Sequence, residues 1–168
     1  MKRIYIFFFI LIIFNCSGAQ KRPRNIQLRP LEQRRAIEII MEVLNKYGLT
    51  ETELNVPLTI TNGKKIISDI FVKPRRFAIE YLTEQDKRDY GELPPKVEGS
   101  DFHVLMSRRE GIEEEVYLLI LDSKDYSYWP NPNPEYRSPD LPTIYEVEDR
   151  LRQTIRDFII AQKDLLYK

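Results

Sequence analysis

The chain has few of the residues on which most metal and redox sites depend. Its 168 residues include one cysteine, Cys16, and one histidine, His103. A single cysteine excludes an intramolecular disulfide, and one cysteine with one histidine excludes a zinc site built from these two residue types. No serine stands in a nucleophile elbow, and the six glycines form no phosphate-binding cluster. Residue type alone leaves one catalytic role open to His103, that of a general base. The sequence predicts no cofactor.

An excess of charge of one sign is also lacking. The chain has 26 Lys and Arg residues and 26 Asp and Glu residues. Without the first fifteen residues, which carry Lys2 and Arg3, 24 basic residues remain against 26 acidic ones, a net charge of about −2. Binding to a phosphate backbone needs a basic surface, so the sequence predicts no nucleic-acid partner. The remaining apolar residues are enough for one core, which indicates a single domain.

The apolar residues are concentrated at the N-terminus. Lys2 and Arg3 precede an unbroken apolar run of eleven residues from Ile4 to Phe14. As a helix this run would rise about 16 Å, which is too short for a hydrocarbon core about 30 Å thick. A short basic start, a short apolar run and an exit of small residues are typical of a secretory signal peptide. We therefore expect residues 1–15 to be a signal peptide and the protein to be exported.

Two cleavage sites follow the apolar run. Ile13-Phe14-Asn15-Cys16 resembles a relaxed bacterial lipobox, although all three positions before the cysteine depart from the usual pattern. The resemblance implies a lipoprotein of the bacterial cell envelope, with lipid such as palmitate on Cys16. Cleavage by ordinary signal peptidase after Ala19 would instead release a soluble periplasmic or secreted protein, and an uncleaved anchor is a third alternative. The position of the only cysteine at the end of the apolar run favours the lipoprotein.

The segment from residue 16 to residue 29 is interpreted as a tether. It has no apolar period and no acidic residue. Its basic residues are Lys21, Arg22, Arg24 and Arg29. Each could add about 1 kcal/mol of attraction to an anionic membrane surface, but a solvated linker is the simpler interpretation.

Residues 30–168 are expected to form one α+β domain. Apolar residues three and four positions apart predict a helix over 31–47, and a capping box at Thr143–Glu146 starts a C-terminal helix. Asn62-Gly63 predicts a two-residue hairpin turn, and Thr83 begins a short helix that ends near Gly91. Strands are expected at 56–60, 66–72, 77–82, 102–107 and 115–121. The predicted fold has two layers, an antiparallel sheet of about five strands with the N-terminal and C-terminal helices packed on it.

Two acidic residues on neighbouring strands are the one candidate for catalysis. If both hairpin turns have two residues, Asp69 lies opposite Glu80 on a face shared with apolar side chains. Facing carboxylates repel each other unless they share a proton, bind a cation or meet a basic side chain. The simpler interpretation is a pair at the rim of the sheet that is balanced by Lys65, Arg75 or Arg76.

The same outline resembles the PD-(D/E)xK nucleases. The resemblance runs from the first predicted helix to Leu82 and rests on the spacing of Asp69 and Glu80. In that family an Asp and a Glu on neighbouring strands hold a divalent metal, so the resemblance implies an exported metal-dependent hydrolase. The lysine that the family places two residues after the glutamate is Leu82 here.

A segment rich in proline and aromatic residues, 122–142, precedes the last helix. It contains Tyr126, Tyr128, Trp129 and Tyr136. These rings form a platform for a glycan or an envelope protein, or Trp129 and one or two of the tyrosines fold inward as a lid over the edge of the core. On balance, the sequence predicts a non-enzymatic binding or structural domain that lipid on Cys16 holds at a membrane. The hydrolase is the alternative.

Overall fold

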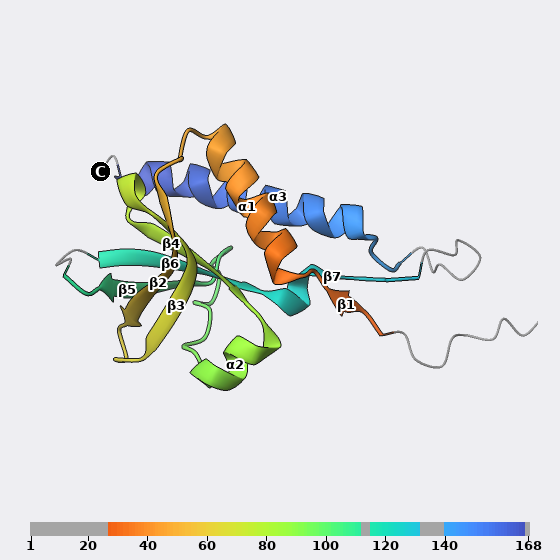
Figure 1. Ribbon diagram of the computed structural model, residues 1–168, viewed down its shortest axis with the longest axis horizontal. Coiled ribbons are helices and arrows are strands. Elements are labelled where there is room, and N and C mark those ends of the chain that lie inside the picture. The colour runs from red at the N-terminus through yellow and green to blue at the C-terminus, as the bar shows by residue number, and fades with distance from the viewer. Residues whose placement is uncertain (1–26, 112–114, 132–139, 167–168) are drawn as a thin grey trace, which may run out of the picture.

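The computed structural model describes residues 27–111, 115–131 and 140–166 (Figure 1). Its helices are α1 (Gln33–Lys46), α2 (Glu84–Tyr90) and α3 (Ile144–Leu166). Five strands form a barrel: β2 (Thr52–Ile60), β3 (Lys65–Val72), β4 (Phe77–Leu82), β5 (Val104–Arg109) and β6 (Glu115–Asp122). Two short strands, β1 (Arg29–Pro30) and β7 (Ser127–Tyr128), form a separate ribbon. Single 3₁₀ turns follow β3 and β6.

The five long strands form a closed barrel in the order β2-β3-β4-β6-β5. All neighbouring strands are antiparallel except β4 and β6, which are parallel. The α+β class is confirmed, but the open, fully antiparallel sheet expected from the sequence is instead this barrel. Closure depends on pairs such as Thr59 with Arg108. Pairings between residues so far apart in the sequence cannot be recognised from the local alternation of apolar and polar residues.

The barrel wall separates two apolar cores. The inner core is made by side chains that face the barrel axis, among them Leu58, Phe71 and Leu118. The outer core lies between α1, α3 and the outer face of β3, β4 and β6, where Phe158 packs edge-on against Phe77 with ring centres 5.3 Å apart. Figure 1 shows α1 and α3 together on one side of the barrel. Because β4 and β6 are buried on both faces, their sequences are almost continuously apolar.

Local capping explains where two of the helices begin. At α3 the Glu146 backbone N–H donates to Thr143 Oγ1, and the Thr143 backbone N–H donates to Glu146 Oε2 at 2.6 Å. Thr83 and Asp86 form the same box at α2. Both boxes confirm the sequence prediction, because each motif brings its own hydrogen-bond partners within three residues.

The connection between β2 and β3 differs from its prediction. A hydrogen bond of 2.9 Å from the Ile60 backbone N–H to the Lys64 carbonyl closes a loop of three residues, 61–63, in place of the expected two. The glycine of this loop has φ of +82°, a conformation that lets a three-residue hairpin loop close. The register therefore shifts by one residue, and Leu58 lies opposite Ile66.

Strand β3 changes the face that it turns to the barrel interior partway along its length. Ile66 and Phe71 both belong to the inner core, although strict alternation would place residues five apart on opposite faces. The change lies beside Asn55 of β2, which has φ of +54°. The sequence pattern alone gave no sign of this irregularity.

The expected signal peptide and Cys16 lie outside the described residues. Within the ranges that the structure describes, no helix combines the length and the apolar character needed to cross a bilayer.

Candidate functional site

The β3–β4 hairpin brings Asp69 and Glu80 together. Phe71 pairs with Ala78, as the sequence predicted, and the regular ladder ends at Ile70 with Ile79. Asp69 and Glu80 occupy the next position, where the two strands separate. Both are buried, with 6% and 1% of their surface exposed. They are therefore not the rim carboxylates of the simpler sequence interpretation.

Each carboxyl group accepts a backbone N–H from the opposite strand. The Asp69 N–H donates to Glu80 Oε2 at 3.0 Å, and the Tyr81 N–H donates to Asp69 Oδ2 at 2.8 Å. Gln33, the first residue of α1, donates through Nε2 to Asp69 Oδ1 at 2.9 Å. The two acids thus link β3 and β4 by hydrogen bonds beyond the end of the backbone ladder, and Asp69 also connects the start of α1 to the hairpin.

Burial controls the protonation of this pair. Burial, and then the charge of Asp69, raise the pKa of Glu80 to about 9. Burial also raises the pKa of Asp69, although the hydrogen bonds from Tyr81 and Gln33 oppose the change. Glu80 therefore keeps its proton at neutral pH, which removes the repulsion between facing carboxylates.

A metal at this position would need further ligands. Across the described ranges, no three side chains of His, Cys, Asp or Glu gather closely enough to hold a metal ion. Asp69 already uses both carboxylate oxygens as acceptors.

The aromatic segment folds partly inward. Tyr126 is only 5% exposed, its ring centre lies 6.1 Å from that of Tyr81, and the Arg150 guanidinium lies 5.9 Å from the ring. Tyr128 and Trp129 are half-buried, whereas Tyr136 lies outside the described residues. Tyr126 is thus part of the core, whereas Trp129, which the lid interpretation also folds inward, keeps some exposed surface, as does Tyr128.

A short ribbon joins this segment to the start of the domain. Arg29 pairs with Tyr128 and Pro30 with Ser127, and the Leu31 N–H donates to the Tyr126 carbonyl at 2.9 Å. Sequence reasoning missed this pairing because two-residue strands have no recognisable period. The ribbon places the chain that leaves the expected tether directly beside the aromatic segment (Figure 1).

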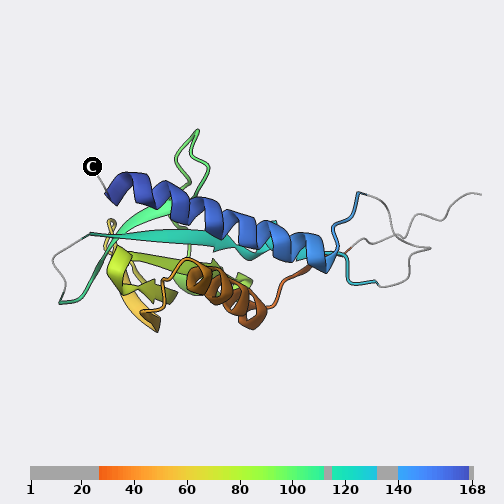
Figure 2. The ribbon, with the colours of Figure 1, turned by 90° about the horizontal axis from the view of Figure 1, so that it is seen from above.

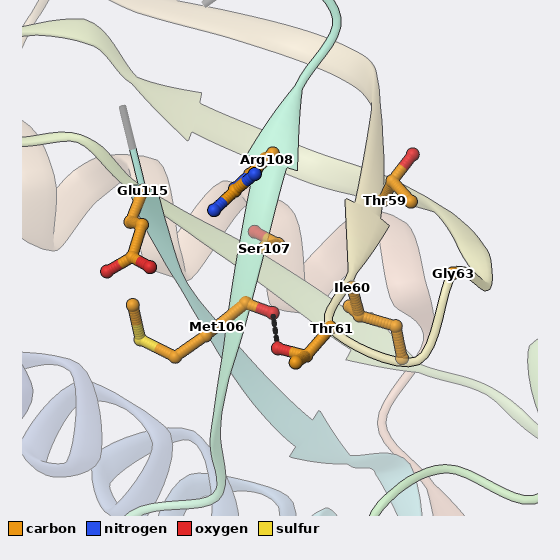
Figure 3. A pocket seen from close by; sticks show the side chains of 8 residues that line it. All are labelled: Thr59, Ile60, Thr61, Gly63, Met106, Ser107, Arg108 and Glu115. Carbon is orange, nitrogen blue, oxygen red and sulfur yellow. Dashed lines mark hydrogen bonds between the residues drawn. The ribbon is translucent and has the colours of Figure 1, made fainter. Parts of the chain in front are cut away.

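A shallow pocket of about 370 Å³ lies between β2 and the β5–β6 hairpin (Figure 3). Its lining residues are Thr59, Ile60, Thr61, Gly63, Met106, Ser107, Arg108 and Glu115. The Thr61 hydroxyl donates to the Met106 carbonyl at 3.1 Å, and Arg108 lies opposite Glu115 on the neighbouring strand. The sequence did not single out this pocket, because its walls come from segments about 45 residues apart.

Comparison with known proteins gives no relative: no family model matches the chain, and no curated protein or solved structure does.

Proposed function

We propose that the protein is a lipoprotein of the bacterial cell envelope, a binding or structural domain without catalytic activity that lipid on Cys16 holds at a membrane surface. The mature chain would begin at Cys16, and the basic segment up to Arg29 would connect the lipid to the barrel domain. The support from the sequence is the signal-peptide pattern and the single cysteine at its end.

If Cys16 carries lipid, the β1–β7 ribbon decides which end of the domain the anchor holds. The chain following the tether pairs with Tyr128 and continues to the hydrogen bond between Leu31 and Tyr126. A lipid on Cys16 would therefore hold the aromatic end of the domain nearest the membrane. The exposed parts of Tyr128 and Trp129 are the proposed contact surface, either for the membrane or for an envelope protein or glycan.

The proposal that the protein has no catalytic activity rests on the structural role of Asp69 and Glu80. Both side chains accept hydrogen bonds from the backbone of the opposite strand, which is a structural role that needs neither substrate nor metal. A buried carboxyl group with a raised pKa is also common at catalytic sites. The metal-dependent hydrolase therefore remains the second candidate function.

The anchor is tested by mass spectrometry of the mature N-terminus, together with labelling by a radioactive or clickable fatty acid. We expect a diacylglyceryl-modified Cys16 in the wild type, and an unlabelled product from the Cys16→Ala variant. A mature chain that starts with unmodified Gln20 would overturn the anchor.

The hydrolase is tested by thermal unfolding of the purified protein with Mg²⁺, Mn²⁺ or Ca²⁺. We expect the same midpoint with and without each ion, in the wild type and in the Asp69→Asn variant. A metal-dependent rise that the Asp69→Asn variant loses would favour the hydrolase over the proposed binding role.

A further inference from the structure

We infer that the end of the domain formed by β1, β7 and the start of α3 docks onto the lipid bilayer itself, with Trp129 at the membrane interface. The inference rests on the proposed function, because it takes the lipid on Cys16 as the anchor. It adds the orientation of the domain and names the lipid surface as its partner.

The elements at this end are far apart in sequence but lie together. Strand β7 contacts both β1 and α3, and Tyr128 and Ile144 line one surface depression with Leu31. Figures 1 and 2 show this end opposite the C-terminal end of α3. With 23 residues, α3 is about 34 Å long, so its far end would stand well away from a membrane that touched its start.

The side chains at this end have the chemistry of a membrane interface. Tyr145 is 79% exposed at the first turn of α3, and Leu28 is 39% exposed beside β1. Tyr128 and Trp129 are half-buried in the adjoining strand and loop. Trp and Tyr concentrate at the boundary of lipid and water, where the ring meets acyl chains and the polar atom meets water or head groups.

The missing hydrogen bond of the Trp129 indole also favours a position at the membrane interface. Its indole Nε1 is enclosed and donates to no atom of the described residues. A buried donor without an acceptor is unfavourable, because the hydrogen bond to water that it loses on burial is not replaced. If the indole turned outward on docking, head-group oxygens would supply that acceptor.

The tether is short enough to favour this contact. Eleven residue steps separate Cys16 from Gln27, and they span at most about 40 Å when fully extended. As a flexible coil they would span roughly 18 Å. The anchor would therefore keep this end at a high local concentration at the surface, where even a weak intrinsic affinity is sufficient for docking. The four basic residues of the tether region would add attraction to anionic lipids.

The test uses the fluorescence of Trp129, which is the only tryptophan of the chain. The mature protein is purified with its native N-terminus and reconstituted into vesicles of phosphatidylethanolamine and phosphatidylglycerol, with or without bromine on the upper acyl chains. We expect brominated lipid to quench at least a third of the emission. The matched control is the double variant Trp129→Phe/Ile160→Trp, which moves the single indole to an exposed position in the C-terminal half of α3. Its emission should be unaffected by bromine.

Mass spectrometry of the same preparation separates the two possible failures. If Cys16 carries lipid and the emission of Trp129 is quenched no more than that of the control, the docking inference is wrong and the anchor stands. If Cys16 carries no lipid, the proposed function fails. Docking is then measured on protein expressed from Cys16 onward without the signal peptide and coupled through the Cys16 thiol to a maleimide lipid. Quenching of Trp129 above the control would support the inference, and equal quenching would overturn it.

Discussion

Replacing Glu80 with glutamine would test how the buried acid pair affects stability. Glu80 is 1% exposed and accepts the Asp69 N–H at 3.0 Å. Glutamine has the same length and keeps an acceptor oxygen for that N–H, but it cannot ionise. The Glu80→Gln variant therefore imitates the protonated acid that a pKa of about 9 implies at neutral pH.

The magnitude follows from the pKa of Glu80, which burial and the Asp69 charge raise from 4.5 to about 9. Below the lower value the side chain is protonated in both the folded and the unfolded chain, so its contribution to stability is complete there. Between the two values only the folded chain keeps the proton, and the free energy of unfolding falls by about 1.4 kcal/mol for each unit of rising pH. From pH 5 to pH 8 the wild type should lose at most about 4 kcal/mol through this group.

The Glu80→Gln variant should not lose stability through this group as the pH rises. We expect similar stability of the two proteins at pH 5 and a more stable Glu80→Gln variant at pH 8, measured by urea unfolding followed by far-ultraviolet circular dichroism at several pH values. Replacing the exposed Glu98 with glutamine is the control and should leave the wild-type pH dependence unchanged. Parallel pH profiles of wild type and Glu80→Gln would refute the claim that Glu80 is buried as the neutral acid.

Three other substitutions follow from single contacts. Asp69→Asn leaves one acceptor oxygen where two are used, and it should lower the free energy of unfolding by about 1 to 3 kcal/mol in urea melts at pH 7. Tyr81→Phe removes the buried hydroxyl that donates to the Leu31 carbonyl at 2.9 Å, and it should cost about 1 to 2 kcal/mol in the same assay, while an unchanged midpoint would contradict this role. Glu148, whose pKa the Arg35 hydrogen bond lowers, contributes stability that is present above pH 4.5 and lost as the pH falls through its folded pKa. Acid unfolding of Glu148→Gln should therefore show a weaker pH dependence than that of wild type, and equal acid transitions would count against the ion pair.

The helices were predictable because their signals are local. The apolar period of α1 and the capping boxes of α2 and α3 involve residues at most four positions apart, and all three helices form close to the expected positions. The strands were also found at their expected places, with boundaries shifted by a few residues. A pattern that depends only on neighbouring residues can be recognised in the sequence without knowledge of the tertiary structure.

The candidate acid pair was only partly predictable. Asp69 and Glu80 meet because the second hairpin keeps the expected pairing of Phe71 with Ala78, and the error in the first turn does not affect that register. Their burial was not foreseen, because it depends on α1 and on the barrel closing around them. The hydrogen bond from Gln33 to Asp69 joins residues 36 positions apart and has no local signature.

The sequence by itself determined the class of the domain, the helices with their caps, the strand segments and the adjacency of two acids. The predicted export signal and the lipid on Cys16 also rest on sequence alone. The tertiary structure decided that the sheet closes into a barrel, that β1 joins β7, and that Asp69 and Glu80 are buried against backbone donors. One physical reason explains why some features could be predicted from the sequence and others only from the tertiary structure. Helix periods, caps and tight turns are set by interactions over a few residues, whereas barrel closure and burial arise from pairings across dozens of residues, whose free energy appears only when the whole chain is packed.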